Sequence, residues 1–250
     1  MQPKFRVEAV SDDDFPELFS ALWEAFENPY QGILRLFFPI HNNDREGSLT
    51  ACIQAQLEEY HEQQPHVTWI KVVDTEANKI AAAAKWYFYP EDPFAKQEGP
   101  IVADWFPEGV TREFATEAVS QFEHPREHMA RRPHAFLHIA FAVPQYRGQG
   151  LGHLFMRWGV EKADELSLEA WLDASEFGAP LYKKYGFREV LFNTVKPIPT
   201  RQLSDEEQEE WAHCEQTFLP ISATVMWRPP FGKYIEGETP MPWNDETHQS

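Results

Sequence analysis

The chain has 250 residues, which is enough for one large domain with a buried core. Its 40 acidic and 22 basic side chains give a formal net charge of −18, so we expect neither nucleic acid nor an anionic membrane as a partner. Cys52 and Cys214 are far apart in the sequence, which argues against a disulfide framework and fits a reducing compartment. No apolar run reaches signal-peptide or membrane-spanning length, so we expect a cytoplasmic protein.

Apolar spacing divides the chain into alternating strands and helices. In chain order we expect a strand at 5–10, a helix at 11–26, an irregular aromatic segment at 28–47, a helix at 49–60, a hairpin of strands at 69–74 and 79–89, a loop at 90–107, a helix at 111–129, a strand at 136–143, a helix from 151, a strand at 168–172, a short helix at 177–185, a strand at 187–195, an acidic helix or loop at 204–215 and a strand at 221–228. This order predicts one domain over 1–230 with an insertion at about 90–134 on the cleft side, followed by a Pro-rich tail at 231–250.

A Gly-rich turn follows the nearly continuous apolar strand at 136–143. It reads PQYRGQGLG at 144–152 and leads into a helix with one apolar face. Free backbone N–H groups at a helix start favour anions, and glycines allow phosphate oxygens to approach closely. A P-loop and a dinucleotide fingerprint both fail on spacing, because no Lys follows the last glycine and position 153 is His. We therefore expect a phosphate cradle formed by Arg147, Gly148, Gln149, Gly150, Leu151 and Gly152.

Two motifs carry a family resemblance. The pattern R-x-x-G-x-G, filled by Arg147, Gly150 and Gly152 after a V-P pair, resembles the acetyl-CoA signature of the GNAT superfamily of N-acetyltransferases. The segment SEFGAPLYKKYGF at 175–187 resembles a second motif of that family, N-x-x-A-x-x-L-Y-x-K-x-G-F. Ser stands where that motif usually has Asn, and Gly stands where it has Ala. The two motifs occur in the family's order, and the close resemblance covers residues 136–195.

The resemblance implies an α/β (α+β) fold with a mixed, splayed central sheet of about six to seven strands flanked by helices. It also implies acetyl-CoA as co-substrate. Ala142 and Val143 would offer backbone groups to the pantetheine arm, and the N–H of Val143 would polarise the thioester carbonyl. Ser175 and Gly178 complete the expected contacts to coenzyme A.

Direct acetyl transfer to an amine needs an acid for the leaving thiolate and a base for the attacking amine. By resemblance Tyr182 is the acid. The pKa of a phenol is ~10 and that of a thiol is ~8.5, so proton transfer from the phenol to the thiolate is only somewhat unfavourable. For the base the sequence offers His138, on the same strand face as Ala140 and Ala142, and Asp173, at the end of the following strand. Either would act directly or through water.

The acidic balance of the chain favours a cationic acceptor, so we expect the primary amine of a small molecule. A protein N-terminus or lysine is an alternative acceptor, and a non-catalytic acyl-CoA-binding module is an alternative function. We expect no metal, because the histidines at 61 and 66 with Glu58, Glu59 and Glu62 fit no H-E-x-x-H spacing and are typical of a solvated helix end. We expect a monomer or a homodimer.

Overall fold

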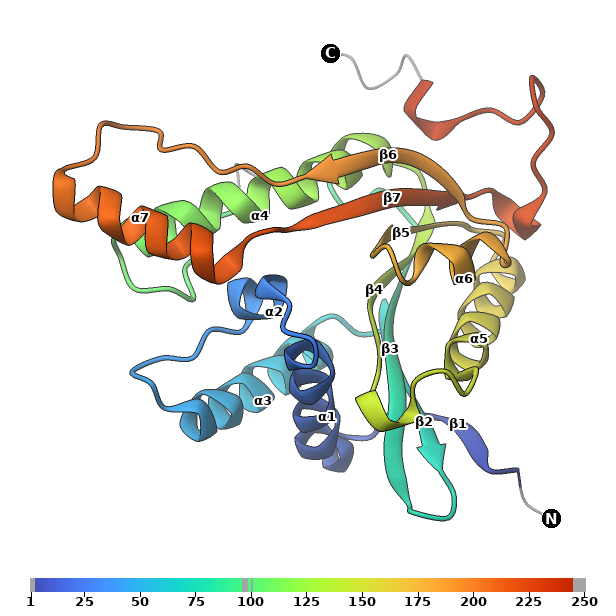
Figure 1. Cartoon of the computed structure of the whole chain (residues 1–250). Coiled ribbons are helices and arrows are strands. Elements are labelled where there is room, and N and C mark those ends of the chain that lie inside the picture. Colours follow the sequence, from blue (N-terminus) through green and yellow to red (C-terminus); the bar gives the residue numbers. More distant parts are fainter. Residues whose placement is uncertain (1–2, 96–98, 100, 245–250) are drawn as a thin grey trace.

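The computed structural model describes residues 3–95, 99 and 101–244, which form one open sheet flanked by helices (Figure 1). The strand order is β1-β2-β3-β4-β5-β7-β6, and every neighbouring pair is antiparallel except β4 and β5. The strands are β1 (Phe5–Ala9), β2 (Val67–Asp74), β3 (Lys79–Tyr89), β4 (His134–Ala142), β5 (Glu169–Ala174), β6 (Arg188–Thr194) and β7 (Ser222–Arg228). This confirms the expected α/β fold and its mixed sheet.

The sheet divides into two parts between β4 and β5. These strands pair in parallel only from His134 with Glu169 to Leu137 with Leu172, whereas β4 continues to Ala142. Figure 1 shows the result: β3 and β4 stand upright in the view, whereas β6 and β7 extend across its upper part to the left. The splay predicted from the family resemblance is therefore present at the motif strand.

Seven helices are distributed over the two parts of the sheet in the described residues. They are α1 (Phe15–Glu27), α2 (Gly32–Phe37), α3 (Arg45–Glu62), α4 (Val110–Met129), α5 (Leu151–Glu165), α6 (Ala179–Lys183) and α7 (Asp205–Phe218). In Figure 1, α1 to α3 lie together beside β3, α5 and α6 lie on the other side of the strands, and α4 and α7 accompany β6 and β7. The structure corrects one expectation, because the segment expected to be irregular at 28–47 contains α2 and the first turn of α3.

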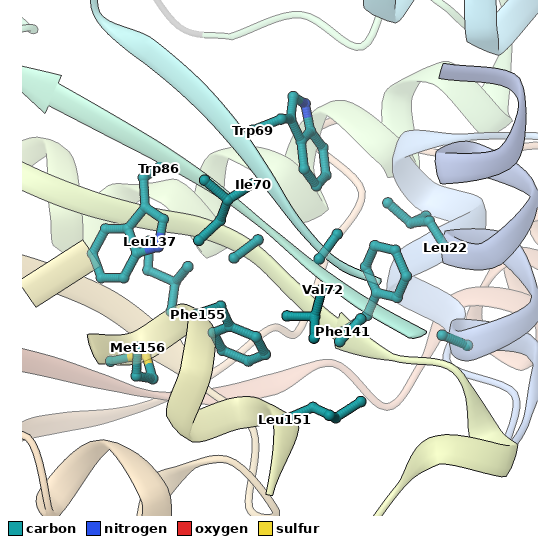
Figure 2. Packing of buried hydrophobic residues seen from close by; sticks show 14 of the residues in the cluster. Leu22, Trp69, Ile70, Val72, Trp86, Leu137, Phe141, Leu151, Phe155 and Met156 are labelled. Carbon is teal, nitrogen blue, oxygen red and sulfur yellow. The ribbon is translucent and has the colours of Figure 1, made fainter. Parts of the chain in front are cut away.

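The largest core cluster joins α1, the central strands and α5. In α1 the apolar residues Phe15, Leu18, Phe19 and Leu22 recur at helical spacing, and all four are buried. On the α5 side, Trp86, Leu137, Phe155 and Met156 pack together, as Figure 2 shows. Gly159 permits this close approach, because a Cβ there would lie 2.1 Å from the Trp86 ring.

A second cluster covers the opposite face of β4, β5 and β7. It contains Phe136, Trp171 and Trp227, and the C-terminal segment adds Trp243, whose ring lies 5.9 Å from Trp171 and 5.5 Å from Trp227. The α4 helix contributes Met129 to the same cluster. This face of the sheet, between α3 and α4, carries most of the polar groups described below.

Candidate functional site

The last paired residues of β4 and β5 mark the point where the two strands separate. Leu137 pairs with Leu172, and the next residues, His138 and Asp173, are no longer paired with each other. We call this point, with the unpaired edge of β4 from His138 to Ala142, the fork. A β-bulge sits at the same place: Trp86 of β3 is opposite Leu137 and Lys85 is opposite Ile139, so His138 is the extra residue. Bulges re-aim side chains and are common beside active sites.

The backbone of β4 beyond the fork follows the alternation of an antiparallel ladder. Val143 N–H donates to the carbonyl of Ala81 at 3.0 Å, so this amide faces β3. The expectation that Val143 N–H polarises a thioester carbonyl is therefore wrong. By alternation, the backbone groups of Ala140 and Ala142 point away from β3 and toward the splay.

The Gly-rich turn forms an open cradle at the start of α5. Gly148 and Gly150 adopt φ values of +75° and +78°, and a Cβ built on either would have no heavy atom within 4 Å. The first N–H groups of α5, from Leu151 onward, have no carbonyl one turn earlier in the helix to bind. Open space, positive-φ glycines and a helix N-terminus fit a diphosphate.

Arg147 differs from the expectation that its side chain contacts phosphate. Its Nε donates to the carbonyl of Ala142 at 3.2 Å, and its Nη2 donates to that of Ala25 at 2.7 Å. Its Nη1 donates to the carbonyl of Asn28. The guanidinium therefore ties the end of α1 to the end of β4, and the cradle is formed by the backbone rather than by this cation.

The second motif packs against the first through α6. A Cβ at Gly152 would lie 2.6 Å from Leu181 Cδ2, so the third signature glycine makes room for this leucine. The Tyr182 ring lies over Gly178, where a Cβ would be 2.7 Å from the ring. Burial raises the pKa of Tyr182 to about 12. Ser175, in the position of the family's Asn, accepts a hydrogen bond from Gly178 N–H at 3.2 Å and so helps to form the turn before α6.

On the opposite face of the sheet, a fixed ionic group lies beside the fork. Lys85, which is 1% exposed, donates to Glu59 Oε1 at 2.7 Å, and the Tyr87 hydroxyl donates to the same oxygen at 2.9 Å. Gln56 donates to Glu59 Oε2 at 2.6 Å. Burial opposes ionisation of Glu59, but the charge and hydrogen bond of Lys85 outweigh it and lower the pKa of this carboxyl. The expectation of a merely solvated helix end is therefore wrong for Glu59.

His138 and Asp173 lie on this same face. The His138 ring is 5.6 Å from those of Tyr87 and Phe136, and its side chain is exposed although β4 is a central strand. The surrounding protein, with the positive charges of Lys85 and Arg126, lowers the pKa of His138 to about 3. Desolvation by the neighbouring protein and these two cations thus favour the neutral form of the imidazole.

Asp173 has the opposite electrostatic character. Burial and the charge of Glu123 raise its pKa to about 7, although Arg126 acts in the other direction. Its neighbours on the strand, Trp171 and the cross-strand Val225, belong to the aromatic cluster under α4. Tyr182 packs with the cluster that contains α5. Tyr182, on α6 beside α5, and Asp173, next to the cluster under α4, thus lie on opposite faces of the sheet.

Sequence reasoning missed the charged groups from α3, β3 and α4. Lys85 carried a usable signal, because it is the lone cation inside the apolar run of β3 and must find a partner. The ion pair of Arg126 and Glu123 on α4 carried no such signal, because nothing in the local sequence indicates which strand the helix covers. The local sequence also gave no sign of the bulge, which removes His138 from the simple alternation with Ala140.

The described residues hold neither a metal-binding cluster nor a membrane-spanning helix. Within 3–95, 99 and 101–244, no group of three or more His, Cys, Asp or Glu side chains has an arrangement that could hold a metal ion. In the same part of the chain, no helix combines the length and apolar character that crossing a bilayer requires.

Comparison with known proteins identifies the domain. The model of the Acetyltransferase (GNAT) family matches residues 15–187. Among solved structures, arylalkylamine N-acetyltransferase 2 from Aedes aegypti has a TM-score of 0.58 at 14% identity, covering 91% of this chain and 99% of that one. The Drosophila melanogaster polyamine N-acetyltransferase has a TM-score of 0.55 at 16% identity, and the match covers 89% of this chain and 97% of that one. A third structure, from Corynebacterium glutamicum, is described as histone acetyltransferase HPA2 and related acetyltransferase. It has a TM-score of 0.52 at 21% identity, and the match covers 91% of this chain and 97% of that one. At these identities the similarity shows the fold alone, and no curated protein matches significantly in sequence.

Proposed function

Because the chain belongs to the GNAT acetyltransferase family, we propose that it is an acetyl-CoA-dependent N-acetyltransferase that acts directly on the primary amine of a small molecule. One observation carries this proposal: an open glycine cradle leads to an unpaired strand edge that has Tyr182 on one side of the sheet and Asp173 on the other. That arrangement would supply a donor site, an acid from one face of the sheet and a base from the other.

Backbone groups would hold the donor. The amides from Gly148 to Gly152 would bind the diphosphate. The splay-facing groups of Ala140 and the N–H of Ala142 would pair with the pantetheine arm, since the carbonyl of Ala142 accepts from Arg147. Acetyl-CoA supplies the acetyl group as a thioester, which an amine attacks with release of a thiolate. A backbone N–H of the free β4 edge, Ala140 or Ala142 in place of Val143, would donate to the developing oxyanion.

Tyr182 would protonate the leaving thiolate. With a pKa of about 12, its hydroxyl is a weaker acid than an exposed phenol, so the proton transfer is more uphill than the sequence suggested. The same burial raises the pKa of a neighbouring thiol, which reduces the difference between the two groups. The side chain is fixed by its contacts with Gly178 and with the Phe187 ring, 6.3 Å away.

Asp173 would accept the proton of the attacking amine. A general base works best when its pKa lies near the working pH, and about 7 meets this condition better than the value of about 3 for His138. The neutral imidazole of His138 would instead accept a hydrogen bond from the acceptor or from a bridging water. We therefore assign Asp173 as the base and His138 as a group that orients the amine.

Small amines fit this proposal best as acceptors. The Aedes and Drosophila proteins are named for arylalkylamines and polyamines, and the net charge of −18 favours cations over anionic acceptors. The acidic face of α7, with Asp205, Glu206 and Glu207 in its first turn, adds to this field.

The test has two stages. First, the purified protein is melted with acetyl-CoA, with ATP and NAD as controls; acetyl-CoA at about 100 times its Kd should add about 2.7 kcal/mol of stability. Second, release of free CoA thiol is measured across arylalkylamines, polyamines and a lysine peptide. Stabilisation by acetyl-CoA without thiol release for any amine would support a binding module, and no stabilisation at all would remove the donor and the proposal with it.

A further inference from the structure

The α4 helix brings an ion pair to the same face of the sheet as Asp173. Glu123 and Arg126 are one turn apart and bonded to each other, and their side chains are 9% and 13% exposed. The Arg126 guanidinium also stacks on two rings, 4.1 Å from the centre of Phe136 and 5.0 Å from that of Phe94. These contacts fix the cation over β4, two residues before His138.

Strand register relates this pair to Asp173. Phe136 is opposite Trp171, and Asp173 follows Trp171 by two residues, on the same face of β5. The guanidinium on Phe136 and the carboxyl of Asp173 therefore lie on one face of the sheet, on adjacent strands. The two charges of the pair affect this carboxyl in opposite senses, since Glu123 raises its pKa and Arg126 lowers it.

The position of α4 at this point is held by β6. Pro125 has no N–H to donate to the carbonyl of Gln121, so the helical bond at this point is missing. Asn193 of β6 replaces it: its Nδ2 donates to Gln121 O at 3.1 Å and to Phe122 O at 3.2 Å. The turn that carries Glu123 and Arg126 is thus bonded to the sheet rather than free to move along it.

We propose that Glu123 and Arg126 are positioning residues that set the pH range over which Asp173 accepts the proton of the acceptor amine. The inference rests on the proposed function only in naming Asp173 as the base. It gives α4, which lies outside both sequence motifs, a part in the reaction. It also explains why an ion pair is buried beside the fork, where a pair of apolar side chains would pack as well.

Other charged and titratable groups surround the fork and bear on how the test is read. They are His138 from β4, Lys85, Tyr87 and Tyr89 from β3, Glu59 from α3 and Tyr182 from α6. The Lys85–Glu59 pair is bonded internally. Arg126 also lowers the pKa of His138, so the Asp173 carboxyl itself has to be followed in the Arg126 variant.

The experiment changes one charge of the pair at a time. Glu123→Gln removes the charge that opposes ionisation, so the acidic limb of the kcat–pH profile should move down by about one unit. Arg126→Met removes the favourable charge, so the same limb should move up by a similar amount. The double variant should return close to the wild-type profile. Glu113→Gln, on the same helix but paired with Arg201 at the surface, is the matched control and should leave the profile unchanged.

A second readout keeps the inference independent of turnover. The carboxyl ¹³C signal of Asp173, assigned by its loss in Asp173→Asn, is titrated by NMR in the wild type and in each folded variant. Opposite displacements for Glu123→Gln and Arg126→Met support the action of the pair on Asp173; if no amine is then acetylated, it is the proposed function that fails. Displacements of the same sign, or none, overturn it, because a purely structural role would not produce shifts of opposite sign.

Discussion

On the donor side of the fork the chain uses its backbone, whereas on the acceptor side it uses side chains from distant segments. The cradle is formed by a turn and a helix start within 147–152, and its glycines leave open space for the ligand. The acceptor side is assembled from α3, β3, β4, α4 and β5, with two internal ion pairs. A backbone site is encoded by a short contiguous motif, while a side-chain site depends on tertiary packing that no local pattern records.

The largest effect that sharpens this comparison is expected at Tyr182, which belongs to the donor side. Tyr182→Phe removes the acid and keeps the ring over Gly178, so kcat should fall by about 10²–10⁴-fold with donor affinity nearly unchanged. Steady-state kinetics and a calorimetric Kd for acetyl-CoA check both parts. Tyr185→Phe is the matched control, because that hydroxyl donates to the carbonyl of His153 and faces α5. A loss of turnover in Tyr185→Phe but not in Tyr182→Phe would reassign the acid.

The acceptor side should respond in stability as well as activity. Glu59→Gln leaves the ammonium of Lys85 buried without its counter-charge, which should destabilise the fold by about 2–3 kcal/mol, less than for a fully enclosed pair because Glu59 is 35% exposed. Urea unfolding measures this. Glu58→Gln, next in sequence and exposed, should change stability by less than about 0.5 kcal/mol. The double variant Glu59→Gln with Lys85→Met should recover part of the loss; no recovery would mean that Glu59 stabilises the fold by another route.

The contrast between the two sides also explains what the sequence could predict. The apolar run of β4 and the Gly-rich turn indicated the donor site, because both are local. The partners of Arg147 could not be predicted, since Ala25 and Asn28 are more than a hundred residues earlier and offer only backbone carbonyls. The sequence could not decide whether His138 or Asp173 is the base. Burial and the charges of α4 separate the pKa values of these two groups, and neither can be read from the local sequence.

The α2 helix was missed for a local reason. Gly32–Phe37 is only six residues long and lies between Pro29 and Pro39, so propensity and length both argued for a loop. Tertiary contact stabilises it: Leu34 and Leu36 are buried, and Gly32 lies against the backbone of Phe218 at the end of α7. Packing across the two parts of the sheet, rather than the segment's own preference, makes it helical.

The cradle can be broken without touching a side-chain partner. Gly150→Asp places a charge in open space where phosphate would bind, and like-charge contact costs several kcal/mol, so affinity for acetyl-CoA should fall by about 100-fold or more. Calorimetry on the folded variant checks this. Gly237→Asp is the control, because Gly237 has the same φ of +78° and equally open surroundings in the C-terminal segment. Equal weakening by both variants would show that backbone strain or net charge, and not the cradle, is responsible.

The smallest expected effect concerns the pH dependence of stability at Asp173. Its pKa is about 7 in the folded protein and ordinarily 3.8, so the folded state binds this proton more tightly than the unfolded chain. The contribution is therefore fully present below pH 4 and is lost as pH rises through about 7. Asp173→Asn removes the titration, so the variant should match wild type at pH 4 and exceed it by about 1–3 kcal/mol at pH 8. Thermal unfolding across this range measures the difference.

A constant difference at all pH values would mean that Asp173 does not titrate in this window, and the base would have to be sought among the other groups at the fork. A difference that grows with pH, together with lost turnover, would show that the acceptor side gives up stability at neutral pH to keep a carboxylate where the amine reacts.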